Sequence, residues 1–294
     1  MATYTSYDQV GKAVQIDDIV SNISPTKTPF LSSIGTENVY ARFFEWEEDA
    51  LRAVQANAQL EGYTAADATL TAMTSRTNQT QILEKTIKVA NTADAIKLHG
   101  RKKETAYQLA KAAEEVKRDL ENALVGVNQA AVVGSAGVAR QMASVPNQIA
   151  AGTTIAGGTA ALTEAKVLSM HQAVYNAGAD ISVLMVKPAD SVIVANFATA
   201  TGRLREITQG GTELVNSIRI YTTPFGSLKV VMNRFMLSTI CLGYDPQYWK
   251  LGVLRPWFKQ KLAITGDNEM WSIVGEYSLK HLNQSASGMV NAIT

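Results

Sequence analysis

The 294-residue chain has little of what several classes of protein depend on. Cys241 is its single cysteine, so no disulfide can form within the chain. Its 27 basic side chains (lysine and arginine) nearly match its 26 acidic ones. The net charge of +1 therefore lacks the basic excess by which dedicated nucleic-acid-binding proteins neutralise phosphate. The longest apolar run, residues 130–139, is interrupted by glycine and serine and is far shorter than the ~20 residues of a membrane helix.

The first residues also lack the basic segment and apolar core of a secretory signal peptide. No fixed-period repeat is visible. A chain of 294 residues that is 46% hydrophobic can bury a sizeable core. We therefore expect a soluble protein that folds as one large domain or two smaller ones and has no contact with a membrane.

Motifs of the common catalytic and metal sites are missing as well. The histidines are His99, His171 and His281, and none lies in an HExxH, HxH or CxxC context. No GxxxxGK[ST], GxGxxG or GxSxG motif occurs. His171 falls on the apolar face of a predicted helix, where we expect a packed core histidine. The sequence thus predicts no catalytic residue, metal ligand or cofactor, and an enzyme with a site built from distant residues is the alternative of another class.

What the chain does contain begins with a proline-punctuated segment, NISPTKTPFLSSIG, at residues 22–35. Proline fixes its own φ and disfavours helix at the residue before it, so Pro25 and Pro29 predict a stiff, extended segment rather than a helix. Four apolar side chains in it favour burial: Ile23, Phe30, Leu31 and Ile34. We expect this arm, residues 1–36, to dock on another part of its own subunit or on a neighbour.

Two strand-like runs follow the arm. Aromatic residues are dense in residues 39–48, and apolar residues alternate in residues 77–89. The connection between the two runs far exceeds the about 2–5 residues of a compact hairpin loop. It therefore predicts a two-stranded ribbon whose tip projects from the body. Residues 36–75 carry seven carboxylates and only two arginines, so this ribbon is acidic.

The strongest helix signal covers residues 101–126, which make a helix of roughly 40 Å. Apolar residues recur there at spacings of three and four, and Glu121 is placed on the polar side of the stripe. The stripe consists of Leu109, Ala113, Val116, Leu120, Ala123 and Val127. A compact basic cluster, KLHGRKK at residues 97–103, precedes the helix, where cations oppose the helix dipole. We expect it to meet the acidic ribbon of a neighbour, the alternative being a solvated helix start.

The rest of the chain mixes short helices and strands. Residues 128–162 are rich in glycine, alanine and threonine and predict a loop. Helices are predicted from Thr163, as the capping residue, to Ala177, and from Asp190, as the cap, to Phe197. The predicted strands are residues 181–187, 219–223, 228–232, 237–244, 269–279 and 287–293, the second and third forming a hairpin. This order indicates an α+β fold rather than a regular βαβ series.

An arm, a projecting ribbon, a long helix and a mixed α/β region without an active site describe a shell-building subunit. The runs ISPTKTPFLSSIG, NTADAIKLHGRKKETAYQLAKAAEEVKRDLENALVG and RQMASVPNQI resemble the major capsid proteins of tailed bacteriophages with the Hong Kong 97 fold. The resemblance covers most of the chain in order, and after about residue 160 it rests mainly on the order of elements. It implies five parts: an N-terminal arm (1–36), an E-loop ribbon (37–90), a P-domain with a spine helix (91–139), a mixed α/β A-domain (140–258) and returning P-domain strands (259–294).

The resemblance further implies assembly, in the cytoplasm of a bacterial host, of hexamers and pentamers into an icosahedral phage head around double-stranded DNA. It implies only nonspecific contact with that DNA, a portal, and a separate scaffolding protein, unless this chain is a processed form. The nearest alternative is an encapsulin-like nanocompartment of the same fold. Some capsid proteins crosslink an E-loop lysine to a neighbour, but no lysine occurs between Lys27 and Lys85. We therefore expect a shell held by noncovalent arm and E-loop contacts, with or without a cement protein.

Particular residues are expected to make these inter-subunit contacts. They are Pro25, Pro29, Phe30, Leu31, Glu45, Glu47, Glu48, Asp49, Arg52, Arg101, Lys102 and Lys103. The first four belong to the arm, the next five to the acidic ribbon, and the last three to the basic cluster.

Overall fold

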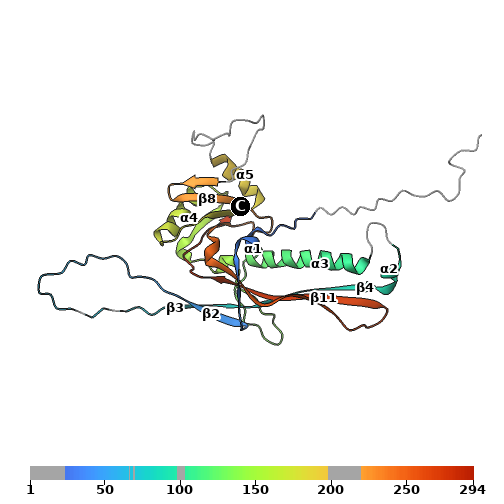
Figure 1. Cartoon of the computed structure of the whole chain (residues 1–294). Coiled ribbons are helices and arrows are strands. Elements are labelled where there is room, and N and C mark those ends of the chain that lie inside the picture. Colours follow the sequence, from blue (N-terminus) through green and yellow to red (C-terminus); the bar gives the residue numbers. More distant parts are fainter. Residues whose placement is uncertain (1–23, 66, 69, 98–102, 198–219) are drawn as a thin grey trace, which may run out of the picture.

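The computed structural model describes residues 24–65, 67–68, 70–97, 103–197 and 220–294 (Figure 1). The described part has mixed helix and sheet content, as the sequence predicts. A long helix, α3 (Glu104–Glu121), lies along a four-stranded sheet, and a six-stranded sheet carries two further helices. Within these residues, no helix combines the length and the apolar character needed to cross a membrane.

The four-stranded sheet has the order β1-β10-β11-β4. Its strands are β1 (Gly35–Asn38), β10 (Trp249–Lys261), β11 (Asn268–His281) and β4 (Gln81–Ala90). β1 runs parallel to β10, and the other neighbours are antiparallel. β10 was not among the predicted strands, and it contains Pro256, which cannot donate to a ladder. In the structure, Pro256 lies where the register shifts between Arg255 and Phe258, so a bulge accommodates it.

The six-stranded sheet has the order β5-β12-β9-β6-β8-β7. Its strands are β5 (Thr154–Ala160), β12 (Gly288–Ile293), β9 (Cys241–Tyr244), β6 (Val183–Val186), β8 (Gly226–Met232) and β7 (Ile220–Thr223). The predicted hairpin of β7 and β8 is confirmed. β5, at the edge of the sheet, replaces part of the loop expected over 128–162. Its glycine, alanine and threonine residues give little strand signal, and pairing with β12 decides its conformation.

The six-stranded sheet separates two apolar clusters, because successive side chains of a strand point to opposite faces. Leu184 of β6 lies in the cluster beneath α4 (Glu164–Asn176) and α5 (Pro188–Phe197). Its neighbour Met185 lies in a second cluster, which joins this sheet to α3 and to the four-stranded sheet. Thr163 caps α4 as predicted, whereas α5 begins at Pro188 rather than after Asp190.

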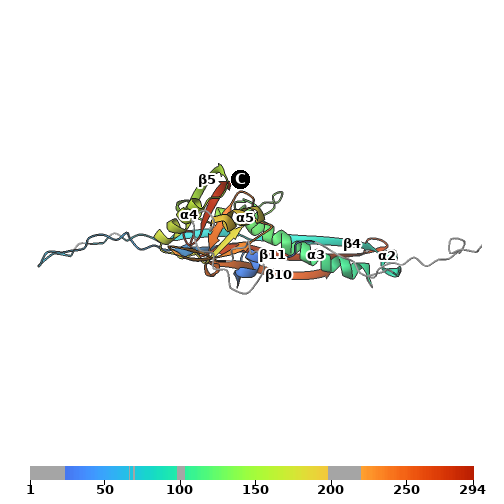
Figure 2. The ribbon, with the colours of Figure 1, turned by 90° about the horizontal axis from the view of Figure 1, so that it is seen from above.

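The ribbon consists of β2 (Phe43–Glu48) paired antiparallel with β3 (Thr74–Gln79), and its tip extends far from the body (Figures 1 and 2). The single strand expected over 77–89 is in fact two strands, β3 and β4. They divide at Thr80, because β3 pairs with β2 whereas β4 pairs with β11. β4 therefore belongs to the four-stranded sheet and not to the ribbon.

Helix α3 continues into a π-helix, η1 (Asn122–Gly126), so the helical run ends where the sequence predicts. Two details of the predicted stripe are wrong: Ala112 is buried instead of Ala113, and Glu121 is fully buried. Short 3-10 helices are η2 (Val145–Asn147), η3 (Ala151–Thr153) and η4 (Pro246–Tyr248), and α2 (Asn91–Ala95) precedes α3.

The arm is not wholly extended, because residues Pro29–Ser33 form a short helix, α1. Proline is well suited to the first position of a helix, where its missing N–H has no intrahelical partner to lose. The residue before it, Thr28, is non-helical (φ −117°, ψ 80°), as a following proline requires. The sequence rule for X–Pro pairs therefore holds at Thr28, whereas the extended conformation expected after it is wrong.

Candidate inter-subunit surfaces

The described part of the arm docks on its own subunit. Phe30 is fully buried, and its ring lies 5.3 Å from that of Tyr244 and 5.8 Å from that of Trp249, between ring centroids. Ile34 is buried in the same cluster, and Ser33 shares a hydrogen bond of 2.8 Å with the Tyr244 hydroxyl. Phe30 is thus packed within its own subunit, and a contact of this side chain with a neighbour stays a prediction.

A buried carboxylate anchors the arm to the end of α3. The Glu121 oxygens accept the backbone N–H groups of Phe30 (2.9 Å) and Leu31 (2.8 Å), which are orphan donors at the start of α1. The Asn233 side-chain amide donates to the same carboxylate at 2.6 Å. Burial raises the pKa of the Glu121 carboxyl, and the hydrogen bonds from Leu31, Phe30 and Asn233 oppose this shift.

Sequence reasoning missed Glu121 because it was assigned to the polar face of the helix. A signal existed, since position 121 lies directly beside Leu120 and two residues before Ala123, so it borders the buried stripe. Leu31 and Pro29 are half-buried where the arm meets α3, and Pro25 is half-buried as well. Contacts of these three residues with a neighbouring subunit stay predictions.

The ribbon presents different residues on its two faces. Glu45 and Glu47 are exposed on one face, where Glu45 accepts a hydrogen bond of 3.1 Å from Ser75. On the other face, Glu48 forms an ion pair with Arg76 (3.0 Å) and accepts the backbone N–H of Gln284 (2.9 Å). Glu48 therefore bonds within the subunit, whereas Glu45 and Glu47 are exposed. Contacts of these three residues with a neighbour stay predictions.

The tip of the ribbon carries large apolar side chains without cover. Leu51 is 99% exposed and Leu70 is 89% exposed. The other members of this exposed set are Val54, Leu60, Tyr63 and Met73. Asp49 and Arg52 are both exposed. Among the described residues, Asp49 accepts the Ala50 N–H and Arg52 donates to the Ala53 carbonyl. A concentration of exposed apolar side chains of this size indicates an interaction surface.

A groove of about 780 Å³ runs between the first half of α3 and the β10–β11 hairpin. Its apolar lining includes Leu109, Ala113, Trp257, Trp271 and Ile273. Charged residues at the groove are Asp94, Lys103, Lys259 and Glu269. A backbone hydrogen bond from Thr105 lowers the pKa of Asp94, and a side-chain hydrogen bond from Lys261 lowers that of Glu269, so both carboxyls are held ionised. Of the predicted basic cluster, Lys103 lies exposed at this groove, and Arg101 and Lys102 lie outside the described residues.

The groove and the ribbon tip lie at opposite ends of the subunit. In Figures 1 and 2, the tip of the ribbon extends in one direction, while α2, the beginning of α3 and the turn of the β10–β11 hairpin lie at the other end. An apolar, acidic projection and an apolar groove with a lysine at its rim are therefore displayed on the same molecule without touching each other.

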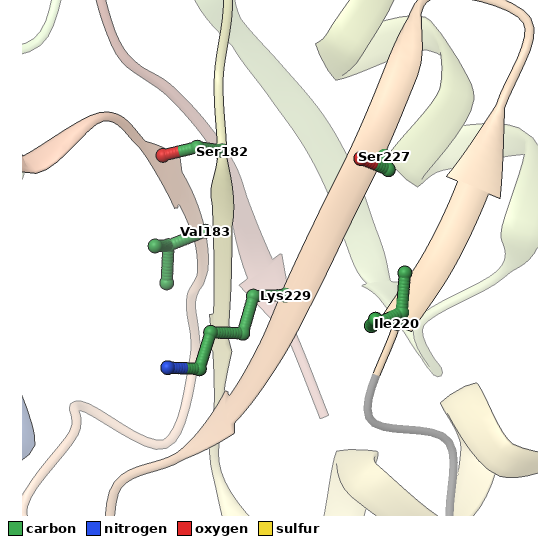
Figure 3. A pocket seen from close by; sticks show the side chains of 5 residues that line it. All are labelled: Ser182, Val183, Ile220, Ser227 and Lys229. Atoms are coloured by element: carbon green, nitrogen blue, oxygen red, sulfur yellow. The ribbon is translucent and has the colours of Figure 1, made fainter.

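A second depression, of about 520 Å³, lies on the β6, β8 and β7 strands (Figure 3). The side chains that line it are those of Ser182, Val183, Ile220, Ser227 and Lys229. Figure 3 shows them spread along three strands rather than converging on one point. Lys229 is the ionisable side chain among these lining residues.

The described histidines are packed into the protein. His171 is buried as predicted, and its Nδ1 lies 2.9 Å from the Thr223 hydroxyl. His281 stacks on Trp249 at 3.8 Å between ring centroids, and burial lowers its pKa to about 4. His99 lies outside the described residues. Across the part of the chain that the structure covers, His, Cys, Asp and Glu side chains form no group of three or more that could hold a metal ion.

Comparisons with known proteins agree on one class. The family model described as SU10 major capsid protein matches residues 2–294. The major capsid protein of Escherichia phage Phieco32 is 31% identical over 338 residues, which cover 98% of this chain and 96% of that protein.

Two solved structures resemble the fold at low sequence identity. The capsid of a native GTA particle has a TM-score of 0.69 at 10% identity, covering 98% of each chain. The holo-SrpI encapsulin complex from Synechococcus elongatus has a TM-score of 0.64 at 10% identity, covering 100% of this chain and 96% of that one. At this identity, the two structures show a shared fold and nothing about activity.

Proposed function

This chain belongs to the SU10 major capsid protein family, and from that premise we propose that its subunits assemble as hexamers and pentamers into an icosahedral phage head that encloses double-stranded DNA. Its fold is the Hong Kong 97 capsid fold, and as a phage major capsid protein it is a structural component of the virion. The observation that carries the proposal is the ribbon tip, whose apolar side chains have no cover within the subunit.

The proposed domains follow the two sheets. The two-stranded ribbon β2–β3 and its tip would be the E-loop, and α3 the spine helix. We place β4, β10 and β11 with α3 in the P-domain, because they share one sheet beside that helix. The six-stranded sheet with α4 and α5 would be the A-domain, and residues 1–36 the arm, anchored at Glu121.

In this proposal, the E-loop of one subunit docks in the groove beside α3 of the next. Both surfaces are apolar, which favours their contact. The groove carries Lys103 and Lys259 as partners for Glu45 and Glu47, beside its own carboxylates Asp94 and Glu269. The two surfaces lie at opposite ends of the subunit, so the contact is head-to-tail. A head-to-tail contact builds a ring where the rotation between subunits closes, as the proposed hexamers and pentamers require. Many such contacts make a durable shell from interfaces that are individually modest.

Charge reversal tests this pairing. We expect Glu45→Lys combined with Glu47→Lys to impair shell formation, and Lys103→Glu in the same chain to restore part of it, as scored by negative-stain microscopy and sedimentation. The control is Glu114→Lys, which reverses an exposed charge on α3 away from the ribbon. Failure of Lys103→Glu to rescue assembly would count against the pairing, and a monodisperse small oligomer of the unmodified chain would count against the shell.

The proposed partners of the shell are a separate scaffolding protein, a portal and, where noncovalent contacts between subunits do not suffice, a cement protein. Assembly is proposed to take place in the cytoplasm of the bacterial host, with packaged DNA touching the lining nonspecifically. The near-neutral net charge of +1 fits a lining that tolerates DNA without gripping it.

A nanocompartment shell is the second candidate, favoured by the fold shared with an encapsulin. The phage reading is better supported, because the phage relative is 31% identical across nearly the whole chain and the encapsulin only 10%. Shells purified from infected cells separate the two: packaged genome-length DNA supports the phage head, and small shells with enclosed protein cargo support the nanocompartment.

A further inference from the structure

The ribbon leaves the body through a short polar segment that is among the most deeply buried in the protein. Asn78 is 1% exposed, Gln79 3% and Thr80 0%, and they stand where β3 gives way to β4. Polar groups that are buried without hydrogen bonds are costly, so a simple bend between two sheets would favour apolar or exposed residues here. The side-chain oxygen of Gln79 has no hydrogen-bond partner among the described residues, so the partners of Asn78 and Thr80 indicate what the segment does.

Asn78 ties the ribbon root to two other parts of the chain. Its side-chain amide donates to the carbonyl oxygen of Leu279 in β11 (2.5 Å), and its Oδ1 accepts the backbone N–H of Ala143 (2.8 Å). The hydroxyl of Ser278 donates to the Gln79 carbonyl at 2.6 Å. One end of the ribbon is thus fixed to the central strand of the four-stranded sheet and to the chain after α3.

Glu276, only 5% exposed at its side chain, forms the second tie. The Thr80 hydroxyl donates to its Oε1 at 2.6 Å, and the Arg255 Nε donates to its Oε2 at 3.0 Å. Arg140 also binds Oε1. The two guanidinium groups balance the buried negative charge of Glu276. Thr80 is the residue that connects the ribbon to this carboxylate. Arg255 comes from the β10 bulge, and Arg140 from the chain after α3, so three separate segments fix one point.

The distal ribbon has no such support. Glu48 makes the outermost hydrogen bond to the body, to the Gln284 N–H. The described residues of 49–73 form no hydrogen bond with described residues outside the ribbon. A long projection supported only at its base points wherever its base directs it. The root network therefore controls the direction of the tip.

We propose that Asn78, Thr80 and Glu276 are positioning residues that aim the ribbon before assembly, fixing its direction relative to the four-stranded sheet in the free subunit. The biological meaning of this inference rests on the proposed function. An E-loop whose direction is already fixed binds its neighbour without the entropy cost of ordering a mobile loop. The direction itself is a property of the single subunit and is measured there.

Distance measurement between two spin labels tests the proposal on the unassembled full-length subunit. Labels are attached at Glu47→Cys on the ribbon and Lys117→Cys on α3, both exposed positions. The native Cys241 is fully buried and burial raises the pKa of its thiol, so it stays protonated and unlabelled. Pulsed electron–electron double resonance then measures the distribution of distances between the label on the ribbon and the label on α3.

The labelled parent is expected to show one narrow distance distribution, and Thr80→Val, which keeps the shape but removes the hydroxyl, a broad one. Loss of a hydrogen bond to a buried carboxylate corresponds to roughly a tenfold rise in the detached population. Thr80→Ser restores the hydroxyl and should restore the narrow distribution. Thr77→Val is the matched control, because Thr77 is an exposed threonine of the same ribbon outside the network.

A broad distribution in the labelled parent, or an unchanged narrow one in both Thr80→Val and Asn78→Ala, would overturn the proposal. Unfolding of a variant is recognised by circular dichroism, and hydrogen exchange at the Thr80 amide, which bonds the Arg42 carbonyl in the native state, gives a second readout in folded variants. Failure of the shell hypothesis looks different, since it would appear as absence of shells from the unmodified chain.

Discussion

Buried side chains from distant parts of the sequence meet at single points in this subunit. Phe30 lies against Tyr244 and Trp249, and Glu121 gathers donors from the arm and from Asn233. Each of these residues contacts parts of the chain that are remote from it in sequence. Single substitutions at such points are therefore expected to act on the stability of the whole subunit.

Phe30→Ala is expected to destabilise the subunit by about 3–5 kcal/mol, because it removes a fully buried aromatic ring and leaves a cavity. Denaturant unfolding of the purified subunit measures this loss. Lys27→Ala, at an exposed position of the same arm, is the control and should change stability by less than about 0.5 kcal/mol. Equal stability of the two variants would show that the arm is not part of the core.

His281 gives the subunit a pH dependence of known sign. Burial lowers its pKa from the ordinary 6.5 to about 4, so the native state binds fewer protons than the unfolded chain between these values. Its contribution to stability is present above pH 6.5 and is lost as the pH falls through about 4, amounting to about 3 kcal/mol at about 1.4 kcal/mol for each pH unit.

Urea unfolding across pH 4 to 7.5 checks the expectation for His281, with His281→Gln as the non-titrating variant. The difference in stability between parent and variant should shrink as the pH falls. Glu121 acts in the opposite sense, because its raised pKa makes it favour the native state at low pH, but it is common to both proteins and cancels. Parallel profiles would contradict the assignment.

Elements differ in how far the sequence alone predicts them, for physical reasons. The β7–β8 hairpin was predictable because Pro224 and Gly226 supply local turn chemistry. α1 was not, because a proline at the first position of a helix and one in an extended segment look alike until the following N–H groups find an acceptor. Here that acceptor is Glu121, some 90 residues away.

The candidate surfaces show the same division. The acidic character of the ribbon is visible in composition, but the choice between Glu47, which is exposed, and Glu48, which is bound to Arg76, depends on which face of β2 meets the body. The groove beside α3 was hidden for another reason. It is built from β10, a strand that was not predicted, and from β11 across the hairpin.

Shortening the ribbon tests whether its tip serves assembly alone. Replacing residues 50–72 with an Asn-Gly turn should leave the thermal midpoint of the subunit nearly unchanged, because the described residues of this stretch pack against nothing in the body. The same deletion should abolish shells in negative-stain micrographs. A large fall in the thermal midpoint would show that the tip supports the fold, and intact shells would remove its role in assembly.

The described part of the subunit is elongated, with the ribbon tip at one end and α2 and the start of α3 at the other (Figure 2). The groove is lined by residues of α3, so it lies at the end away from the tip. This shape suits head-to-tail assembly and leaves the six-stranded sheet beside the long axis. No lysine stands between Lys27 and Lys85, so the ribbon has no amine for a covalent link to the next subunit. The stability of the shell is therefore expected to come from shape complementarity and from apolar surface buried between subunits.

Mature shells boiled in detergent should accordingly run as a single band near 31.7 kDa on a denaturing gel. The physical reason is that noncovalent contacts do not survive denaturation, whereas an isopeptide bond does. Purified particles, treated with and without reductant, provide the measurement. A ladder of multimers that persists under reducing conditions would contradict a noncovalent shell.

The docking of Phe30 also sets an order in time. A ribosome that has made Phe30 must add more than two hundred residues before Tyr244 and Trp249 exist to cover it. At ~5–20 residues per second, this takes roughly 10 to 40 s. β1 waits equally long for β10, and β4 waits slightly less long for β11. The nascent subunit thus exposes the Phe30 side chain and the unpaired strands β1 and β4 until synthesis is nearly complete. The cell must keep neighbouring nascent chains apart throughout that interval.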